Sequence, residues 1–296
     1  MSETALITIL AMPKPFRGHA GVIQRNAIAS WTRLQPRPEV ILFGHEEGAA
    51  ECARELGVVH IPEVARNRYG TPLLAGILAE GERRASHELM VYVNADIILP
   101  EEFLEGVEKV RQTFPKFLAV GRRTNLEVRE PLDFRDGWGG RLKERVRREG
   151  ALESHTAIDC FVFPRGTYEE IPALAIGRVW FDQWLIKYAR RKGLPVVDLT
   201  KFVDMVHQIH DYGHVAGGRE WVYGGAEAEE NLEYYGERPH RYTILSATHA
   251  MAGDGAIRRV YWRREAAEVK RILWEVFVHK TVGVRKRLGL SGRQRV

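Results

Sequence analysis

Four short apolar segments in the first hundred residues alternate with helical patterns, and this alternation most constrains the fold. The segments cover residues 4–12, 39–43, 58–61 and 90–93. In the stretches between them, apolar residues recur every three or four positions, which is the spacing of an amphipathic helix. Strands that alternate with helices in this way predict a doubly wound α/β domain with a Rossmann-like, mostly parallel sheet.

The fourth apolar segment ends in Asn94-Ala95-Asp96, and Pro100 then opens a helix. Asp96 is therefore expected at the carboxyl end of a central strand, where open α/β sheets place their ligand crevice. Its carboxylate and the Asn94 amide oxygen can bind a divalent cation, because Mg²⁺ and Mn²⁺ prefer hard oxygen ligands. Alternatively, Asp96 is only a loop acid or the N-cap of the following helix.

The loop after the first strand lacks two common nucleotide-binding signatures. It contains Pro13-Lys14-Pro15-Phe16 where a nicotinamide or flavin site would have GxGxxG. No GxxxxGK[ST] sequence occurs in the chain, so a P-loop is excluded. The two cysteines, Cys52 and Cys160, lack CxxC spacing and indicate neither a disulfide framework nor a zinc site.

The second half carries an acid and a group of histidines in positions suited to chemistry. Asp182 opens a helix, where it either acts as a general base or simply caps the helix N-terminus. His207, His210 and His214 follow two short strands. An imidazole that converges with Asp96 would complete a divalent metal site. Alternatively, these histidines are polar residues of a loop surface.

The order of these features resembles that of the GT-A-fold nucleotide-sugar glycosyltransferases, in particular the large inverting family numbered two. The resemblance covers residues 4 to about 215. It implies that Asn94-Ala95-Asp96 binds the metal and the diphosphate, that Asp182 is the catalytic base, and that His207 or His210 completes the metal shell. It also implies nucleotide contacts from Pro13, Glu46, Arg66, Asn67, Asn94 and Asp96.

The activity implied by this resemblance is metal-dependent sugar transfer from a nucleotide-diphosphate donor to an acceptor hydroxyl, with inversion and with Mg²⁺ or Mn²⁺ as cofactor. Two residues depart from the family pattern, since Asn94 and Phe181 stand where acids are common. The Gln-x-x-Arg-Trp motif of polymer synthases is absent, so a single addition is expected. The alternatives are a sugar nucleotidyltransferase and a non-catalytic nucleotide- or carbohydrate-binding relative.

Tryptophans gather on the predicted acceptor side of this site. Trp138 lies between glycines in the charged stretch 127–153, and we expect it to stack on a sugar as part of a lid. Trp184 shares a helical face with Tyr188, which predicts a core position. Asp159, within a predicted strand, is a second candidate for the base or a buried scaffold residue.

Positive charge is concentrated at the C-terminal end of the chain. Residues 256–296 carry a net charge of +9, whereas the whole chain carries +5, so residues 1–255 are acidic at −4. We therefore predict a catalytic domain over 1–255 and a basic amphipathic helical segment over 256–296. Within the domain, the nucleotide-binding half covers about 1–100 and the acceptor half about 101–215. The acidic body argues against a nucleic-acid partner.

The basic segment predicts a peripheral contact with an anionic membrane. Residues 257–288 combine an apolar stripe with basic faces, a pattern typical of helices that lie on a membrane surface. Alternatively, the same stripe packs on the catalytic domain or pairs two subunits as a homodimer. No secretory signal and no membrane-spanning apolar run is recognised. We therefore expect a cytoplasmic protein that contacts the inner face of the membrane.

Overall fold

The computed structural model describes residues 6–210, 218–236 and 242–260. The chain divides into two units, Met1–Arg259 and Val260–Val296, and the elements below belong to the first unit. Most of the predicted contact segment, 257–288, lies outside the described residues, and its binding to a membrane or to a second subunit stays a prediction. Its first residues form a strand rather than the start of a helix. No helix among the described residues is long and apolar enough to cross a membrane.

Strands and helices alternate along the first unit. The strands are β1 (Ile7–Ala11), β2 (Glu39–Phe43), β3 (Val59–Ile61), β4 (Leu89–Val93), β5 (Ile97–Ile98), β6 (Leu118–Leu126), β7 (Ala151–Leu152), β8 (Ile158–Pro164), β9 (Val196–Asp198), β10 (Met205–Gln208), β11 (His249–Met251) and β12 (Ile257–Arg259). The helices are α1 (Gly18–Trp31), α2 (Ala49–Leu56), α3 (Leu74–Arg84), α4 (Glu102–Thr113), α5 (Trp138–Glu149), α6 (Phe181–Arg191), α7 (Gly218–Gly224), α8 (Ala226–Tyr235) and the short η1 (Ile244–Ser246).

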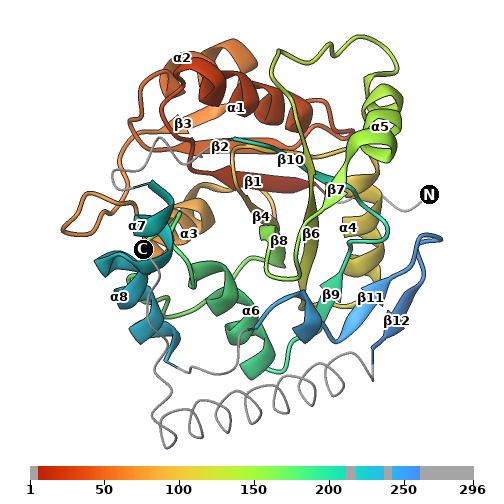
Figure 1. Ribbon diagram of the computed structural model, residues 1–296. Helices are drawn as coiled ribbons and strands as arrows, with labels where there is room; N and C mark the ends of the chain where they lie inside the picture. Colours follow the sequence, from red (N-terminus) through yellow and green to blue (C-terminus); the bar gives the residue numbers. More distant parts are fainter. Residues whose placement is uncertain (1–5, 211–217, 237–241, 261–296) are drawn as a thin grey trace, which may run out of the picture. The chain divides into compact units, whose positions relative to one another are not determined.

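The strands form a 12-stranded sheet whose main path runs β12-β11-β9-β6-β8-β4-β1-β2-β3 (Figure 1). Strands β3, β2, β1 and β4 pair in parallel, as the alternation of strands and helices predicts. Strand β8 enters antiparallel between β4 and β6 and joins the second half of the chain to the first. The predicted α/β class with a mostly parallel sheet is confirmed.

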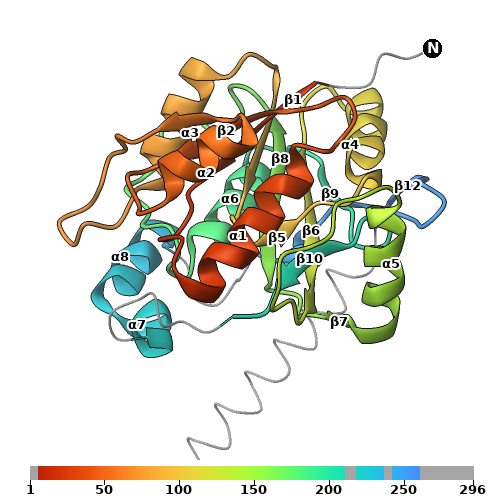
Figure 2. The same ribbon diagram turned by 90° about the horizontal axis from the view of Figure 1, so that it is seen from above.

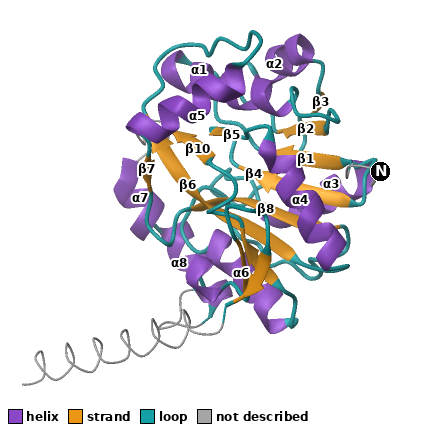
Figure 3. Cartoon of the chain, turned by 90° about the vertical axis from the view of Figure 1, so that its right-hand side faces the viewer, coloured by secondary structure: helices purple, strands orange, loops and turns teal. Residues whose placement is uncertain are grey.

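Helices pack on both faces of this sheet (Figure 3). Helices α1, α2 and α4 bury their apolar side chains on one face, where Trp31 and Phe103 are fully buried. Helices α3 and α6 cover the other face, together with Phe161 and Leu185. All residues of β1 and β4 are buried, as expected for parallel strands between two helical layers. Each large apolar side chain buried in this way contributes about 1.5–3 kcal/mol.

A short branch of the sheet carries one of the predicted histidines. Strand β10 pairs antiparallel with β5 and parallel with β6, so that His207 lies opposite Ile97 and Asn125. The sequence predicts a strand over 202–206 with the histidines in the loop after it, whereas the strand begins at Met205 and includes His207. Pairing with β5 and β6 selects this register, and such a tertiary contact leaves no local sequence signal.

A third apolar cluster includes Trp138, Leu142 and Val146 of α5. Helix α5 lies on the other side of this unit from α7 and α8 (Figure 2). Trp138 is buried in this cluster and packs edge-on against Phe134, so its predicted role as an exposed sugar platform is not supported. The spacing of Trp138, Leu142 and Val146 along one helix face was the available signal for this core position. The predicted core position of Trp184 is confirmed, since it is buried.

Gly21 lets the loop after β1 lie against the first turns of α1. A Cβ at this position would lie 2.8 Å from the Phe16 carbonyl oxygen, so we expect Gly21→Ala to destabilise the protein by about 1–3 kcal/mol. Gly140 in α5 is the matched control, because a Cβ there meets no atom within 4 Å. Gly140→Ala should stabilise by about 0.5–1 kcal/mol through helix propensity. Urea unfolding measures both, and equal stabilities would contradict this packing.

Candidate functional site

A cavity of about 1330 Å³ opens at the carboxyl ends of β1, β2 and β4. Open α/β sheets bind their ligands at this edge, because the loops that follow parallel strands converge there. The cavity is lined by eight of the predicted site residues, namely Pro13, Glu46, Arg66, Asn94, Asp96, Asp182, His207 and His210. Asn67 is the predicted site residue that does not line it.

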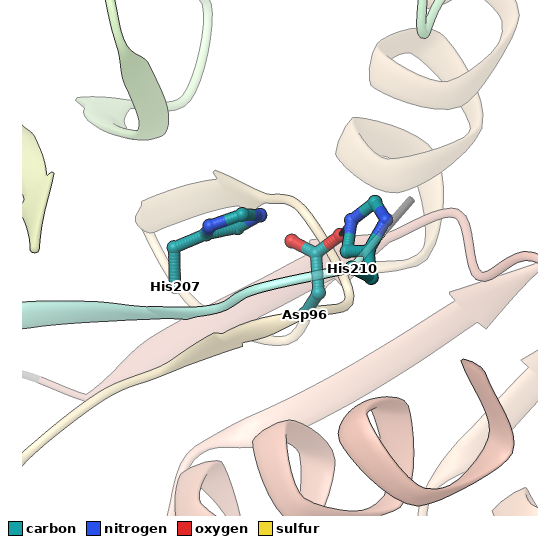
Figure 4. A group of neighbouring side chains, drawn as sticks. All are labelled: Asp96, His207 and His210. Carbon is teal, nitrogen blue, oxygen red and sulfur yellow. Dashed lines mark hydrogen bonds and ion pairs between the residues drawn. The ribbon is translucent and has the colours of Figure 1, made fainter. Parts of the chain in front are cut away.

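Asp96, His207 and His210 form a cluster in which one ligand atom from each residue lies within 4.8 Å of the others. Asp96 precedes β5, His207 lies in β10, and His210 follows β10 closely. The antiparallel pairing of β5 with β10 therefore brings together residues that are far apart in the sequence. Figure 4 shows the two imidazole rings on either side of the Asp96 carboxylate. A carboxylate between two imidazoles is a suitable ligand set for a divalent transition-metal ion.

Asp96 is 4% exposed, and its carboxylate is held in the charged form by its neighbours. Burial by itself raises the pKa of Asp96, but the charge of Lys14 and the imidazoles of His210 and His207 outweigh burial and hold this pKa well below its usual value. The Asp96 Oδ1 atom is buried and accepts no hydrogen bond from the described residues. A buried carboxylate oxygen without a donor is the feature expected where a cation binds.

His207 is oriented for metal binding by a hydrogen-bonded chain. Asn125 donates from Nδ2 to Glu153 at 2.7 Å, which turns its Oδ1 atom toward His207 Nδ1 at 2.9 Å. His207 therefore carries its proton on Nδ1 and keeps the lone pair on Nε2. Burial is the main cause that lowers the pKa of His207 to about 4, so the ring is neutral near pH 7. A neutral imidazole is the form that binds a metal ion.

Lys14 lies against the same cluster, and sequence analysis did not select it. Its Nζ atom is 3.0 Å from Asp96 Oδ2 and 3.1 Å from His210 Nε2. Its backbone is held by Gln24, which accepts from the Lys14 amide and donates to the Lys14 carbonyl. The available signal was the position of Lys14 at the end of the first strand, next to Pro13, which the resemblance already implied as a nucleotide contact.

Asn94 is turned toward a second carboxylate in the cavity. Its Nδ2 atom donates to Asp159 Oδ1 at 2.7 Å, and Asp159 Oδ2 forms an ion pair with Arg123 at 3.0 Å. Asp159, the alternative candidate for the base, is therefore engaged by an amide and a guanidinium. In this arrangement the Asn94 amide orients the Asp159 carboxylate, and because it is neutral it adds no charge beside Asp96.

Asp182 lies in the first turn of α6 and lines the cavity. The residue that precedes this helix, Trp180, has a φ of 84°, a left-handed conformation that non-glycine residues rarely adopt. Burial raises the pKa of Tyr92, and the charges of Asp159 and Asp182 raise it further. Phe181, next to Asp182 in the chain, packs edge-on against the Tyr92 ring, so the first turn of α6 lies beside β4.

Glu46 and Arg66, which both line the cavity, form an ion pair. Arg66 Nη2 lies 3.0 Å from Glu46 Oε1, and Arg66 Nη1 donates to the Gly70 carbonyl at 2.9 Å. The second oxygen of Glu46, Oε2, is buried and accepts no hydrogen bond from the described residues. An N–H group of a bound ligand would satisfy this oxygen.

Asn67 orders the loop after β3, and its side chain lies outside the cavity lining. Its Oδ1 atom accepts from the backbone amides of Tyr69 and Thr71, and its Nδ2 atom donates to Glu227 at 2.7 Å. Glu227 also forms an ion pair with Arg178 at 2.7 Å and is 1% exposed. These contacts join the loop of residues 66–72 to α8.

Helices α7 and α8 complete the wall of the cavity, a contribution that sequence analysis missed. Trp221 and Tyr223 of α7 line the cavity and are 38% and 52% exposed. The Trp221 indole Nε1 atom lies 3.3 Å from Glu227 Oε2, which ties α7 to the buried ion pair. The sequence around Trp221 contains no motif that points to a site, so only the tertiary structure reveals this wall.

Comparisons with known proteins find similarity among solved structures alone. No family model matches the chain, and no curated protein matches it. Glucosyl-3-phosphoglycerate synthase from Mycobacterium tuberculosis matches with 14% identity over 78% of this chain and 80% of that chain, at a TM-score of 0.45. A mannosyltransferase from Pyrobaculum calidifontis, solved with GDP-Man and Mn²⁺, matches with 14% identity over 72% of this chain and 59% of that chain, at a TM-score of 0.42.

Glu227 holds the cavity wall together through its buried ion pair. We expect Glu227→Gln to destabilise the protein by about 3–5 kcal/mol, because the substitution leaves the Arg178 guanidinium without its counter-ion. Glu144→Gln is the control, since Glu144 and Arg147 form an exposed pair on α5, and its effect should be below about 1 kcal/mol. Urea unfolding measures both. Similar small losses for the two variants would show that the buried pair does not stabilise this wall.

Proposed function

We propose that this protein is a divalent-metal-dependent glycosyltransferase, which moves a sugar from a nucleotide-diphosphate donor to an acceptor hydroxyl. The observation that carries the proposal is the cluster of Asp96, His207 and His210 at the carboxyl ends of parallel strands, with Asp182 in the same cavity. A metal site and a separate carboxylate in one cavity are the two groups that such a transfer requires.

The cavity residues fit a divalent cation. Asp96 Oδ1 lacks a donor among the described residues, and His207 presents its Nε2 lone pair. The cavity is lined by six carboxylates and four cationic side chains, so an anionic diphosphate would be repelled without further positive charge. Two imidazoles beside one carboxylate favour Mn²⁺ over Mg²⁺, because Mg²⁺ prefers ligand sets made of oxygen.

We propose that the nucleotide of the donor binds beside Pro13, Glu46 and Arg66. In this proposal the free oxygen of Glu46 accepts an N–H of the base or a hydroxyl of the ribose, and Arg66 holds the Glu46 carboxylate in position. The diphosphate then extends from this side toward Asp96. Asn67 acts indirectly, through the loop that carries Arg66.

In the proposed reaction, Asp182 accepts the proton of the acceptor hydroxyl while that oxygen attacks the anomeric carbon. The bond between this carbon and the diphosphate oxygen breaks at the same time, which inverts the anomeric configuration. Asp96, His207 and His210 would hold a divalent cation, which would neutralise charge at the leaving diphosphate. Asp182 is assigned to proton transfer because it lines the cavity from the first turn of α6, while Asp159 is held by Arg123 and Asn94.

We propose that the acceptor binds beside α6 and α7. Trp221 and Tyr223 expose part of their rings at the cavity wall, and an aromatic face there offers a contact for a sugar ring or another apolar acceptor surface. These two residues take the role that the sequence suggested for Trp138.

Donor binding should depend on both the metal and Asp96. We expect a panel of UDP-, GDP- and dTDP-sugars to include a donor that binds with Mn²⁺ and is slowly hydrolysed, with EDTA abolishing both signals. Asp96→Asn should abolish the metal-dependent part of binding, because the cluster loses its charged ligand. Calorimetry and product analysis measure these effects. Silence across the whole panel, with and without metal, would refute the proposed activity.

Asp182→Asn should leave donor binding nearly unchanged and lower kcat by about 10²–10⁴, the usual contribution of a general base. Asp159→Asn is the comparison variant, and we expect it to affect kcat less, because Asp159 is paired with Arg123. Steady-state kinetics with separate KM and kcat values measures both. If Asp182→Asn weakens donor binding and spares kcat, Asp182 is structural and the base lies elsewhere.

A further inference from the structure

The geometry points to Lys14 as an internal cation that occupies the metal-binding cluster until a nucleotide diphosphate draws it away. The ammonium group thereby makes metal binding and nucleotide binding cooperative. This inference rests on the proposed function and adds a role for a residue outside the ligand set. Lys14 Nζ lies 3.0 Å from Asp96 Oδ2 and 3.1 Å from His210 Nε2, and these two atoms are themselves 3.1 Å apart.

The Lys14 ammonium lies between the ligand atoms of Asp96 and His210. An ammonium group can only donate hydrogen bonds, so Lys14 Nζ donates to Asp96 Oδ2 and, in the His210 tautomer with its proton on Nδ1, also to His210 Nε2. In the other tautomer, His210 Nε2 donates to Asp96 Oδ2 instead. In both tautomers Lys14 lies against the same oxygen and the same ring nitrogen that a metal ion needs.

A metal ion and Lys14 compete for this place. A metal ion lies about 2.1 Å from its oxygen and nitrogen ligands. With the three distances given above, any ion bound to both Asp96 Oδ2 and His210 Nε2 lies within about 4 Å of Nζ in its present position. Repulsion between a divalent ion and an ammonium at that separation is strong in a buried site. The Lys14 side chain must move before both ligands can bind metal.

Only the side chain of Lys14 is free to move. Its backbone amide and carbonyl are both hydrogen-bonded to Gln24, which is buried in α1. The Lys14 side chain is 28% exposed and lines the cavity, so its flexible stem can carry the ammonium away from Asp96. The oxygens of a diphosphate in the cavity would supply new partners for it. A diphosphate thus removes the competing cation, and by linkage the metal favours diphosphate binding to the same extent.

The test compares Lys14→Met with the parent protein in binding experiments that involve no turnover. Electron paramagnetic resonance of free Mn²⁺ gives the Mn²⁺ affinity with and without UDP, and again with and without GDP, after correction for Mn²⁺ bound to free nucleotide. Without nucleotide, we expect Lys14→Met to bind Mn²⁺ at least about tenfold more tightly, because the competing ammonium is gone. A tenfold change in affinity corresponds to about 1.4 kcal/mol. The factor by which nucleotide tightens Mn²⁺ binding should fall at least severalfold.

Two further variants control for charge and for folding. Lys143→Met removes the same charge from α5, where Lys143 forms an exposed pair with Glu102, and it should leave Mn²⁺ affinity unchanged. Lys14→Ala provides a second removal of the ammonium in case the methionine side chain perturbs the cavity, and thermal melts verify that each variant is folded.

The outcomes separate this inference from the proposed function. Mn²⁺ binding that is equal or weaker in both folded Lys14 variants overturns the role of Lys14 while leaving the metal site in place. Mn²⁺ binding that is absent from the parent and from all variants overturns the metal site and, with it, the inference. If Lys143→Met gains as much Mn²⁺ affinity as Lys14→Met, the gain comes from the change in net charge alone. That result would overturn the specific role of Lys14.

Discussion

A buried carboxylate requires a positive partner, and much of the cavity is organised around this requirement at Asp96. An unpaired charge in a protein interior costs several kcal/mol, so the Asp96 side chain can be buried because the Lys14 ammonium pairs with it and the imidazoles of His207 and His210 lie beside it. These partners come from the loop after β1 and from β10 and the residues that follow it. The site therefore forms only when β10 pairs with β5, since that pairing brings both histidines to the end of β4.

The contacts of Asn94 explain why an amide can stand beside this carboxylate. Asn94 donates to Asp159, and Arg123 neutralises Asp159 from the other side. A second acid at position 94 would face Asp159 at hydrogen-bonding distance, and two like charges so close together disfavour ionisation. In the proposed metal site, the two imidazoles would supply the ligands that a second carboxylate would otherwise provide. The proposed preference for Mn²⁺ over Mg²⁺ has the same origin, because imidazole nitrogens stand where a second carboxylate would supply oxygen ligands.

The cavity wall formed by α7 and α8 depends on a different buried charge, that of Glu227. Glu227 is buried on α8 and binds the side chains of Asn67, Arg178 and Trp221. One carboxylate thus joins the loop after β3, the segment before α6 and helix α7. The loop that carries Arg66 is consequently ordered by the same group that orders the aromatic wall. A displacement of α7 would therefore be transmitted through Glu227 to the loop that carries Arg66.

The sequence alone determined the α/β class, the parallel first half of the sheet, and the placement of Asp96 and Asp182 at element ends, because periodicity and strand ends are local properties. It also predicted histidine ligands, although His207 was expected in a loop. Only the tertiary structure decided that His207 lies in β10 and that Lys14, Trp221 and Glu227 belong to the cavity. These outcomes depend on strand register and on long-range ion pairs, which arise when distant segments meet and leave no periodic signal in the chain.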